Sequence, residues 1–216
     1  MTEVRFKNQA GMTLAGRLEL PEPGGALFPV VVFAHGFDSG KDSPRGLAVA
    51  DNLRAAGLAT FLFDFTGHGD SQGVKSDATI ERQVDDLGAA VDYAAAADGI
   101  DPDAVGVNGA SSGGLVALIE ARRDTRVKAL VLRGPRTDGM LAFGPMFNLP
   151  ILIIQGEFDP LLAGSTLFYE SLQCDKRLET VAGADHLFSG PDQLDKVIVL
   201  TAWWFKARLM TGRRAA

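Results

Sequence analysis

The chain has 216 residues, enough for one α/β domain that buries a core without disulfides or metals. Its 46% hydrophobic and 22% charged residues exclude disordered, collagen-like and coiled-coil compositions. A net charge of -6, with Arg213-Arg214 as the one basic block, disfavours nucleic acid as a partner. The 25 glycines exceed the usual share of about 7%. The positions where they cluster therefore need an explanation.

The single cysteine, Cys174, excludes an internal disulfide framework and a cysteine-rich zinc site, and fits a reducing compartment. The first seven residues alternate polar and apolar and lack the apolar core of a signal peptide. No apolar run approaches the roughly 18 residues of a membrane span. We therefore expect a cytoplasmic protein with no membrane partner; the sequence leaves open whether it is a monomer or a homodimer.

The predicted strands change character along the chain. Residues 4–7 and 14–20 alternate polar and apolar around Ala10-Gly11, which predicts an antiparallel hairpin with one wet face. The later strands are nearly continuous apolar runs, as is typical of parallel strands buried on both faces. These runs are 30–34, 59–63, 105–107, 129–132 and 151–154, with a last strand at 178–181.

Helices are predicted between these strands. Ser43-Pro44 supplies an N-cap and a proline at the first position of a helix that reaches about Ala56 and ends at Gly57. Further helices are predicted at about 79–97, 112–122, 161–172 and 192–209. The alternation predicts an α/β fold: one domain, residues 1–216, with a mostly parallel central sheet of about eight strands and helices on both faces.

Two segments allow more than one interpretation. Residues 134–149 show no periodicity, and we interpret them as a short lid whose Phe143, Met146 and Phe147 either line an apolar pocket or seal the sheet. In the last helix, Trp203-Trp204-Phe205 suggests a partner surface, but a stripe of apolar residues at helical spacing favours packing in the core.

One strand-to-helix turn carries the strongest chemical signal. Gly109-Ala110-Ser111-Ser112-Gly113 follows an apolar strand and precedes an apolar helix, which is the context that a Gly-x-Ser-x-Gly nucleophile turn requires. The glycines are needed because side chains two residues from the serine would collide with the strand or helix. We predict Ser111 as the nucleophile; Ser112 lies off the central position and contributes its backbone N–H.

A serine hydroxyl needs a base, and the base needs a carboxylate to orient it. His186 lies in the loop after the last strand and is the predicted base. Asp159, at the tip of the loop after the strand 151–154, is the best candidate for the carboxylate, with Glu157 and Asp185 as alternatives. The chain order Ser111, Asp159, His186 is the order found in α/β-hydrolases.

Donors to a developing oxyanion are also expected. Gly36 lets the backbone after the strand 30–34 turn its amides toward the serine, so the predicted pair is the N–H of Phe37 and the N–H of Ser112. We interpret His35 as a buried shaper of this loop. The segment 64–71, which contains His68, is interpreted as a glycine-rich turn whose Asp and Ser side chains bind backbone amides.

These residues resemble the α/β-hydrolase superfamily over residues 4–209. The stretches 35–37, 63–71, 109–113 and 183–186 are similar to bacterial cinnamoyl or feruloyl esterases and to serine-aminopeptidase-like hydrolases. The compact build looks like dienelactone hydrolases, although those have a cysteine where this chain has Ser111. The resemblance implies hydrolysis of carboxylic esters through an acyl-serine, without metal or cofactor. The short lid suggests small acyl or alcohol groups.

Other functions remain open at this stage. A peptidase, a thioesterase or an acyltransferase can use the same three residues, and the fold alone does not separate them. A non-catalytic binding protein of the same fold is a further alternative. Such proteins usually lack the nucleophile or the histidine, and here all three positions are filled.

Overall fold

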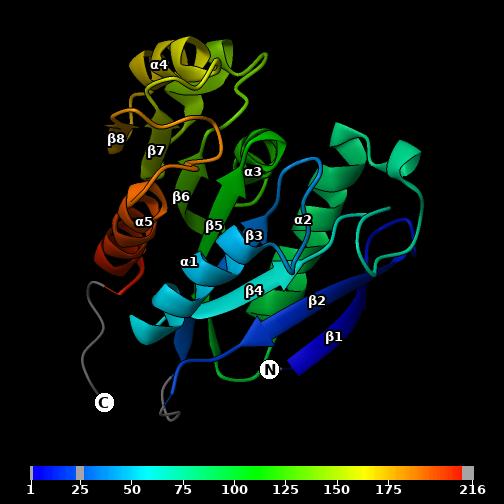
Figure 1. The fold of residues 1–216 in the computed structure, drawn as a ribbon. Helices are drawn as coiled ribbons and strands as arrows, with labels where there is room; N and C mark the ends of the chain where they lie inside the picture. Colours follow the sequence, from blue (N-terminus) through cyan, green and yellow to red (C-terminus); the bar gives the residue numbers. More distant parts are fainter. Residues whose placement is uncertain (1, 23–26, 211–216) are drawn as a thin grey trace.

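The computed structural model describes residues 2–22 and 27–210, and within them one eight-stranded sheet forms the centre of the molecule (Figure 1). The strand order is β1-β2-β4-β3-β5-β6-β7-β8. The pairs β1–β2 and β2–β4 are antiparallel, and all other pairs are parallel. The strands are β1 Thr2–Lys7, β2 Thr13–Glu19, β3 Phe28–Ala34, β4 Ala59–Phe63, β5 Ile100–Ala110, β6 Val127–Arg133, β7 Ile151–Gly156 and β8 Lys176–Val181.

Within the same described residues, five α-helices alternate with the strands. The predicted hairpin, helices and strands are confirmed to within a few residues at most ends. The largest difference is β5, which is far longer than the apolar run that predicted it and continues to the residue before Ser111. The helices are α1 Pro44–Ala55, α2 Ile80–Ala95, α3 Ser112–Ala121, α4 Leu162–Ser171 and α5 Gln193–Leu209.

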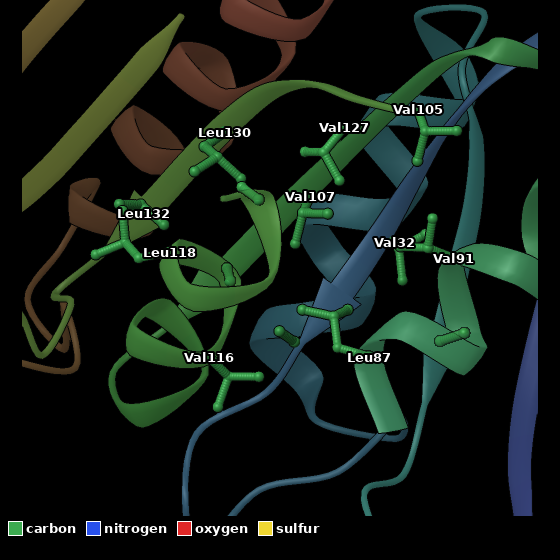
Figure 2. Packing of buried hydrophobic residues seen from close by; sticks show 14 of the residues in the cluster. Val32, Leu87, Val91, Val105, Val107, Val116, Leu118, Val127, Leu130 and Leu132 are labelled. Atoms are coloured by element: carbon green, nitrogen blue, oxygen red, sulfur yellow. The ribbon is translucent and has the colours of Figure 1, made fainter. Parts of the chain in front are cut away.

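The helices cover both faces of the sheet. Helices α2, α3 and α4 pack on one face, where valines and leucines of β3, β5 and β6 meet those of α2 and α3 (Figure 2). Helices α1 and α5 pack on the other face. Residues of one strand alternate between these two clusters, as the pleat requires: Leu130 and Leu132 of β6 face α3, whereas Ala129 and Val131 face α1 and α5. The parallel strands are therefore buried on both sides.

The start of α1 differs from its predicted cap. Pro44 is the first helical residue, but the Ser43 hydroxyl makes no capping hydrogen bond. Thr79 does cap α2, since its Oγ1 accepts the N–H of Arg82 at 3.2 Å. The proline alone, whose fixed φ suits the first turn, favours the start of α1.

The segment 134–149 packs beside α4, and none of its residues lines the cleft that contains Ser111. It includes a short 3-10 helix, η2 Leu141–Met146. Phe147 is buried, with its ring centroid 5.8 Å from that of Phe168 in α4, so it seals the sheet. Phe143 lies under the guanidinium of Arg122, and Met146 is 64% exposed. A lid role for this segment stays a prediction.

The three aromatic residues near the end of α5 divide between core and surface. Trp204 and Phe205 are fully buried, as predicted, but Trp203 is 42% exposed. Its ring lies under Arg177 and Arg208, with the guanidinium carbons 4.9 Å and 5.5 Å from the ring centroid. Consecutive residues of a helix point about 100° apart, so they cannot all face the sheet. Arginine stacking covers the ring that remains outside.

A buried carboxyl lies between α2 and α3. Glu120 of α3 is 7% exposed, and a Cβ at Gly88 of α2 would lie 2.9 Å from its Oε1. Burial, and then the neighbouring Asp124, raise the pKa of Glu120 from its ordinary 4.5 to about 7. The folded state therefore binds this proton more tightly than the unfolded chain does. The stability that follows is complete below pH 4.5 and is lost as the pH rises to about 7.

Replacing Glu120 by Gln keeps the shape of the side chain and removes its charge. We expect E120Q to exceed the wild type in free energy of unfolding by about 1–2 kcal/mol near pH 8, and to match it near pH 4, as measured by urea denaturation. The exposed Glu170 of α4 supplies the control, since E170Q should follow the wild type at both pH values. A constant difference between E120Q and the wild type across this range would contradict the prediction.

Candidate active site

Ser111 lies in a strained turn between β5 and α3. Its φ of 53° is in the left-handed region, which residues other than glycine rarely adopt. Its N–H donates to the carbonyl of Arg133 on β6 at 3.0 Å, and its own carbonyl accepts the N–H of Gly114 at 3.0 Å. The turn is thus fixed to the neighbouring strand and to the helix that follows it.

The two glycines of the motif are needed for the steric reason given by the sequence. A Cβ at Gly113 would lie 2.1 Å from the carbonyl oxygen of Ala34, and a Cβ at Gly109 would lie 2.8 Å from that of Gly113. Both distances are far below van der Waals contact. The turn can therefore bring α3 close to β3 and β5 only because these positions have no side chain.

The structure brings Ser111, His186 and Asp159 together from the carboxyl ends of three strands. The Ser111 Oγ lies 3.1 Å from Nε2 of His186, and Nδ1 of His186 lies 2.7 Å from Oδ2 of Asp159. Asp159 is buried, and its Oδ1 accepts the N–H of Leu161 at 2.9 Å. A carboxylate held at both oxygens orients the imidazole, because it accepts from the ring nitrogen that faces away from the serine.

The alternative carboxylates Glu157 and Asp185 are engaged elsewhere. Glu157 Oε2 accepts the N–H of Gly183 at 2.7 Å. Asp185 Oδ1 accepts the N–H of Leu187 at 3.0 Å and that of Ser189 at 2.9 Å. These hydrogen bonds hold the pKa of Asp185 below its usual range. Both acids thus stabilise the loop that carries His186.

The predicted oxyanion donors lie on the two sides of Ser111. A Cβ at Gly36 would lie 3.4 Å from the Cβ of Ser111, so the turn that contains Phe37 passes directly beside the serine. The N–H of Ser112 is the first of α3, where no carbonyl of the preceding turn can accept it. Gly36, Phe37, Ser111 and His186 line one open cleft of about 760 Å³.

The other two histidines support the Phe37 turn. Nδ1 of His35 lies 2.8 Å from the carbonyl oxygen of Gly36, and Nε2 accepts the N–H of Phe65 at 3.1 Å. Burial lowers the pKa of His35 to about 4, so the ring is neutral at pH 7. His68 Nε2 lies 2.7 Å from the carbonyl oxygen of Phe37. Neither ring forms a hydrogen bond with Ser111 in the described part of the chain, as expected for residues that shape the loop.

The segment 64–71 is the structural turn that the sequence predicts. Asp64 Oδ2 accepts the N–H of Asp70 at 3.1 Å, and its Oδ1 accepts the N–H of Lys41 at 2.7 Å. The Lys41 ammonium, itself buried, lies 3.1 Å from the same carboxylate. Ser71 accepts the N–H of Ala15 and donates to the carbonyl of Asp64. This network joins the loop after β3 to the loop after β4.

Gly134 is a site residue that the sequence analysis missed, because it was assigned to the predicted lid. Its φ is +51°, and a Cβ there would lie 3.1 Å from Asp159 Oδ2 and 3.1 Å from His186 Nδ1. A small residue is therefore needed behind the histidine–aspartate pair. A glycine that directly follows a buried strand at this edge of the sheet was the available signal.

No metal cluster or membrane-spanning helix is found in the part of the chain that the structure describes. Within residues 2–22 and 27–210, no three His, Cys, Asp or Glu side chains are grouped so that they could hold a metal ion. No helix in the same ranges has the length and apolar character needed to cross a bilayer. Cys174 is free and half-buried, and burial raises the pKa of its thiol.

Comparison with known proteins places this chain in a family. The model of the family described as "Serine aminopeptidase, S33" matches residues 26–146. A dienelactone hydrolase from Anabaena variabilis is 33% identical, with a TM-score of 0.84, and the match covers 96% of this chain and 97% of that chain. Est1E from Butyrivibrio proteoclasticus, solved with ferulic acid, shares the fold with a TM-score of 0.87 at 21% identity, over 96% of this chain and 100% of that chain.

Curated sequence relatives also include a hydrolase. The thiohydrolase aneE from Aspergillus aculeatus is 35% identical over 173 residues, which are 80% of this chain and 53% of that protein. The chain spans about half the length of the curated relatives it matches. The chain belongs to the α/β-hydrolases, and within them to the serine aminopeptidase S33 family. The family model and the dienelactone hydrolase structure support a hydrolase-type domain.

The position of Gly134 generates a prediction with a matched control. Gly134→Ala and Gly139→Ala both place a side chain at a positive φ, but a Cβ at Gly139 has nothing within 4 Å. Each variant should lose about 1 kcal/mol in free energy of unfolding. Only G134A should lose hydrolytic rate, by about tenfold or more, because its methyl group displaces His186 or Asp159. Equal rates for the two variants would show that Gly134 is not needed for the pair.

Proposed function

We propose that this protein is a serine carboxylesterase that cleaves esters of small acyl or aryl groups through an acyl-serine. The observation that carries the proposal is the chain of two hydrogen bonds, 3.1 Å from Ser111 to His186 and 2.7 Å from His186 to Asp159. Such a chain converts an inert hydroxyl into a nucleophile at neutral pH, because the proton has an acceptor and the acceptor has a fixed tautomer.

In the first half of the reaction, Ser111 Oγ attacks the ester carbonyl carbon and His186 Nε2 takes the hydroxyl proton. The carbonyl oxygen becomes an oxyanion, which the N–H groups of Phe37 and Ser112 bind. The intermediate collapses, the bond to the alcohol breaks, and His186 returns the proton to the leaving oxygen. Asp159 orients the ring and stabilises its positive charge throughout.

In the second half, water replaces the alcohol. His186 takes a proton from the water, the hydroxide attacks the acyl carbon, and the same two amides bind the oxyanion. Collapse releases the acid and returns the proton to Ser111. The cleft is open, and residues 134–149 do not line it, which favours small substrates that need no cover.

Two neighbouring serines allow a direct test of the nucleophile. We expect S111A to lose about 10⁴- to 10⁶-fold in kcat on a short-chain aryl ester, leaving the residual rate due to binding and the oxyanion donors. S112A keeps the amide and removes a hydroxyl that has no hydrogen-bond partner among the described residues, so its loss should stay within about tenfold. A fluorophosphonate should label the wild type and S112A but not S111A. Failure to label the wild type would favour the non-catalytic alternative.

The choice among three acids can be tested in the same assay. D159N should lower kcat by about 10⁴-fold, because the amide favours the wrong tautomer of His186. E157Q and D185N remove acids whose hydrogen bonds hold the loop around His186, so they should retain most of the rate and lose about 1 kcal/mol or less of stability. A loss in D185N as large as that in D159N would reassign the carboxylate.

Thioester hydrolysis is the second candidate, and the identity to thiohydrolase aneE favours it. Peptide hydrolysis, suggested by the family description, and acyl transfer use the same acyl-serine. Rates on an oxoester, a thioester and an aminoacyl anilide with one common acyl group distinguish these activities. The proposed function requires the highest kcat/KM on the oxoester, and an added alcohol that diverts product to a new ester would indicate acyl transfer.

A further inference from the structure

Two arginines line the cleft that contains Ser111 and His186. Arg133 is the last residue of β6, and its neighbour across the sheet is Ala110, the residue before Ser111. Arg45 lies in the first turn of α1 and borders the same cleft. Both side chains are half-buried.

The pleat of β6 explains why the two arginines meet. Val131 points toward α1 and α5, and Leu132 points toward α3. Arg133 therefore points to the side of Val131, where α1 begins. In Figure 1, α1 lies on this face of the sheet, near the ends of β3 and β5. Both arginines also border a smaller hollow of about 30 Å³ next to the cleft, together with Ser43 and Asn108.

Neither guanidinium has a partner among the residues that the structure describes. Among residues 2–22 and 27–210, no hydrogen bond or ion pair joins the side chain of Arg45 or Arg133 to another group. Burial, and then the charge of Arg45, lower the pKa of Arg133 to about 10. Half-buried guanidinium groups without acceptors are unfavourable, and two that repel each other are more so. An anion placed between them would remove both penalties.

The carboxylates that border the cleft do not supply this anion, because each has another cation. Asp38 pairs with Lys75 at 2.5 Å. Asp42 pairs with Arg17 at 2.9 Å and with Lys41 at 3.0 Å. Asp64 pairs with Lys41 at 3.1 Å. Arg45 and Arg133 are thus the arginines of this cleft that remain available to a ligand.

We propose that Arg45 and Arg133 bind a carboxylate on the acyl group of the substrate, so that the preferred substrates are half-esters of short dicarboxylic acids. The proposal rests on the proposed ester hydrolysis. A guanidinium fork matches the two oxygens of a carboxylate. A single negative charge suits a protein whose net charge of -6 opposes polyanions. Arg133 adjoins the Ser111 turn, so an acyl chain of a few carbons spans the two.

The position of the charge on the acyl group has a kinetic consequence. The acyl group stays attached to Ser111 after the alcohol has left, so the arginines hold it during both halves of the reaction. A carboxylate on the alcohol would be released after the first half. The arginines therefore position the carbonyl for attack by Ser111 and then by water.

The first test compares two esters that differ only in charge, 4-nitrophenyl hydrogen glutarate and 4-nitrophenyl methyl glutarate. The wild type should show a kcat/KM about 10- to 100-fold higher on the anionic ester, the range expected for charge-assisted hydrogen bonds. In R133Q this ratio should fall to near one, and in R45Q it should fall by part of that amount. The neutral ester serves as the internal reference for each variant.

The control variant is R123Q, because Arg123 is an exposed arginine beyond the C-terminal end of α3 and borders a different pocket. It removes one positive charge and should retain the full preference of the wild type. A ratio near one in the wild type, or a preference retained in R133Q, would overturn the proposal. A preference lost equally in R123Q and R133Q would assign it to the overall field, and would also overturn it.

A second test separates this proposal from the proposed function, because it needs no turnover. Calorimetry on S111A should detect binding of monomethyl glutarate but not of dimethyl glutarate, and S111A/R133Q should bind neither. If all esters are inert but the anion binds, the esterase proposal fails and the carboxylate site stands. If esters are cleaved without preference and no anion binds, the esterase proposal stands and the carboxylate site fails. Thermal unfolding of R133Q at or above the wild-type temperature confirms that it folds, since it removes an unpaired charge.

Discussion

The strained turn at Ser111 is the constraint on which the rest of the site depends. The residue is held at a positive φ by hydrogen bonds to β6 and to α3, and the turn fits only because positions 109 and 113 lack side chains. Its location at the carboxyl end of β5 puts the serine hydroxyl at the edge of the sheet where the loops after β3, β7 and β8 begin. His186, Asp159 and Phe37 come from these loops. One local conformation therefore aligns groups that are far apart in sequence.

Charged and polar side chains hold the cleft wall without taking part in the proposed reaction. Buried Lys41 joins Asp64 to the loop after β3, and His68 holds the carbonyl of Phe37. Glu157 and Asp185 bind amides in the loops around His186. With these acids engaged, Arg45 and Arg133 are left facing the cleft. The acids therefore hold the loops around the cleft, and the two arginines are left to bind a substrate.

Three residues of the candidate site could be predicted from local sequence motifs. Gly-x-Ser-x-Gly between an apolar strand and a helix, an acid at a strand end and a histidine in the last loop identified three residues that the structure brings together. Each motif depends on backbone conformation near itself, so it is visible in sequence. The packing of residues 134–149 could not be predicted, because a segment without periodicity carries no signal about its partner. In the structure, Phe147 packs against Phe168 of α4. Packing in the core is a wrong prediction for Trp203, because adjacent helical residues cannot share one face.

The sequence by itself determined the alternation of strands and helices, the apolar strands that need burial on both sides, and the serine turn, since these follow from local sterics and hydrophobic pattern. Tertiary structure alone decided that β4 lies between β2 and β3, that Asp159 rather than Glu157 or Asp185 reaches His186, and that Gly134 lies behind the pair. It also decided that the charge of Arg133 meets that of Arg45 beside Ser111. The reason is physical: these outcomes depend on distances between strands that the chain connects only through long loops and helices.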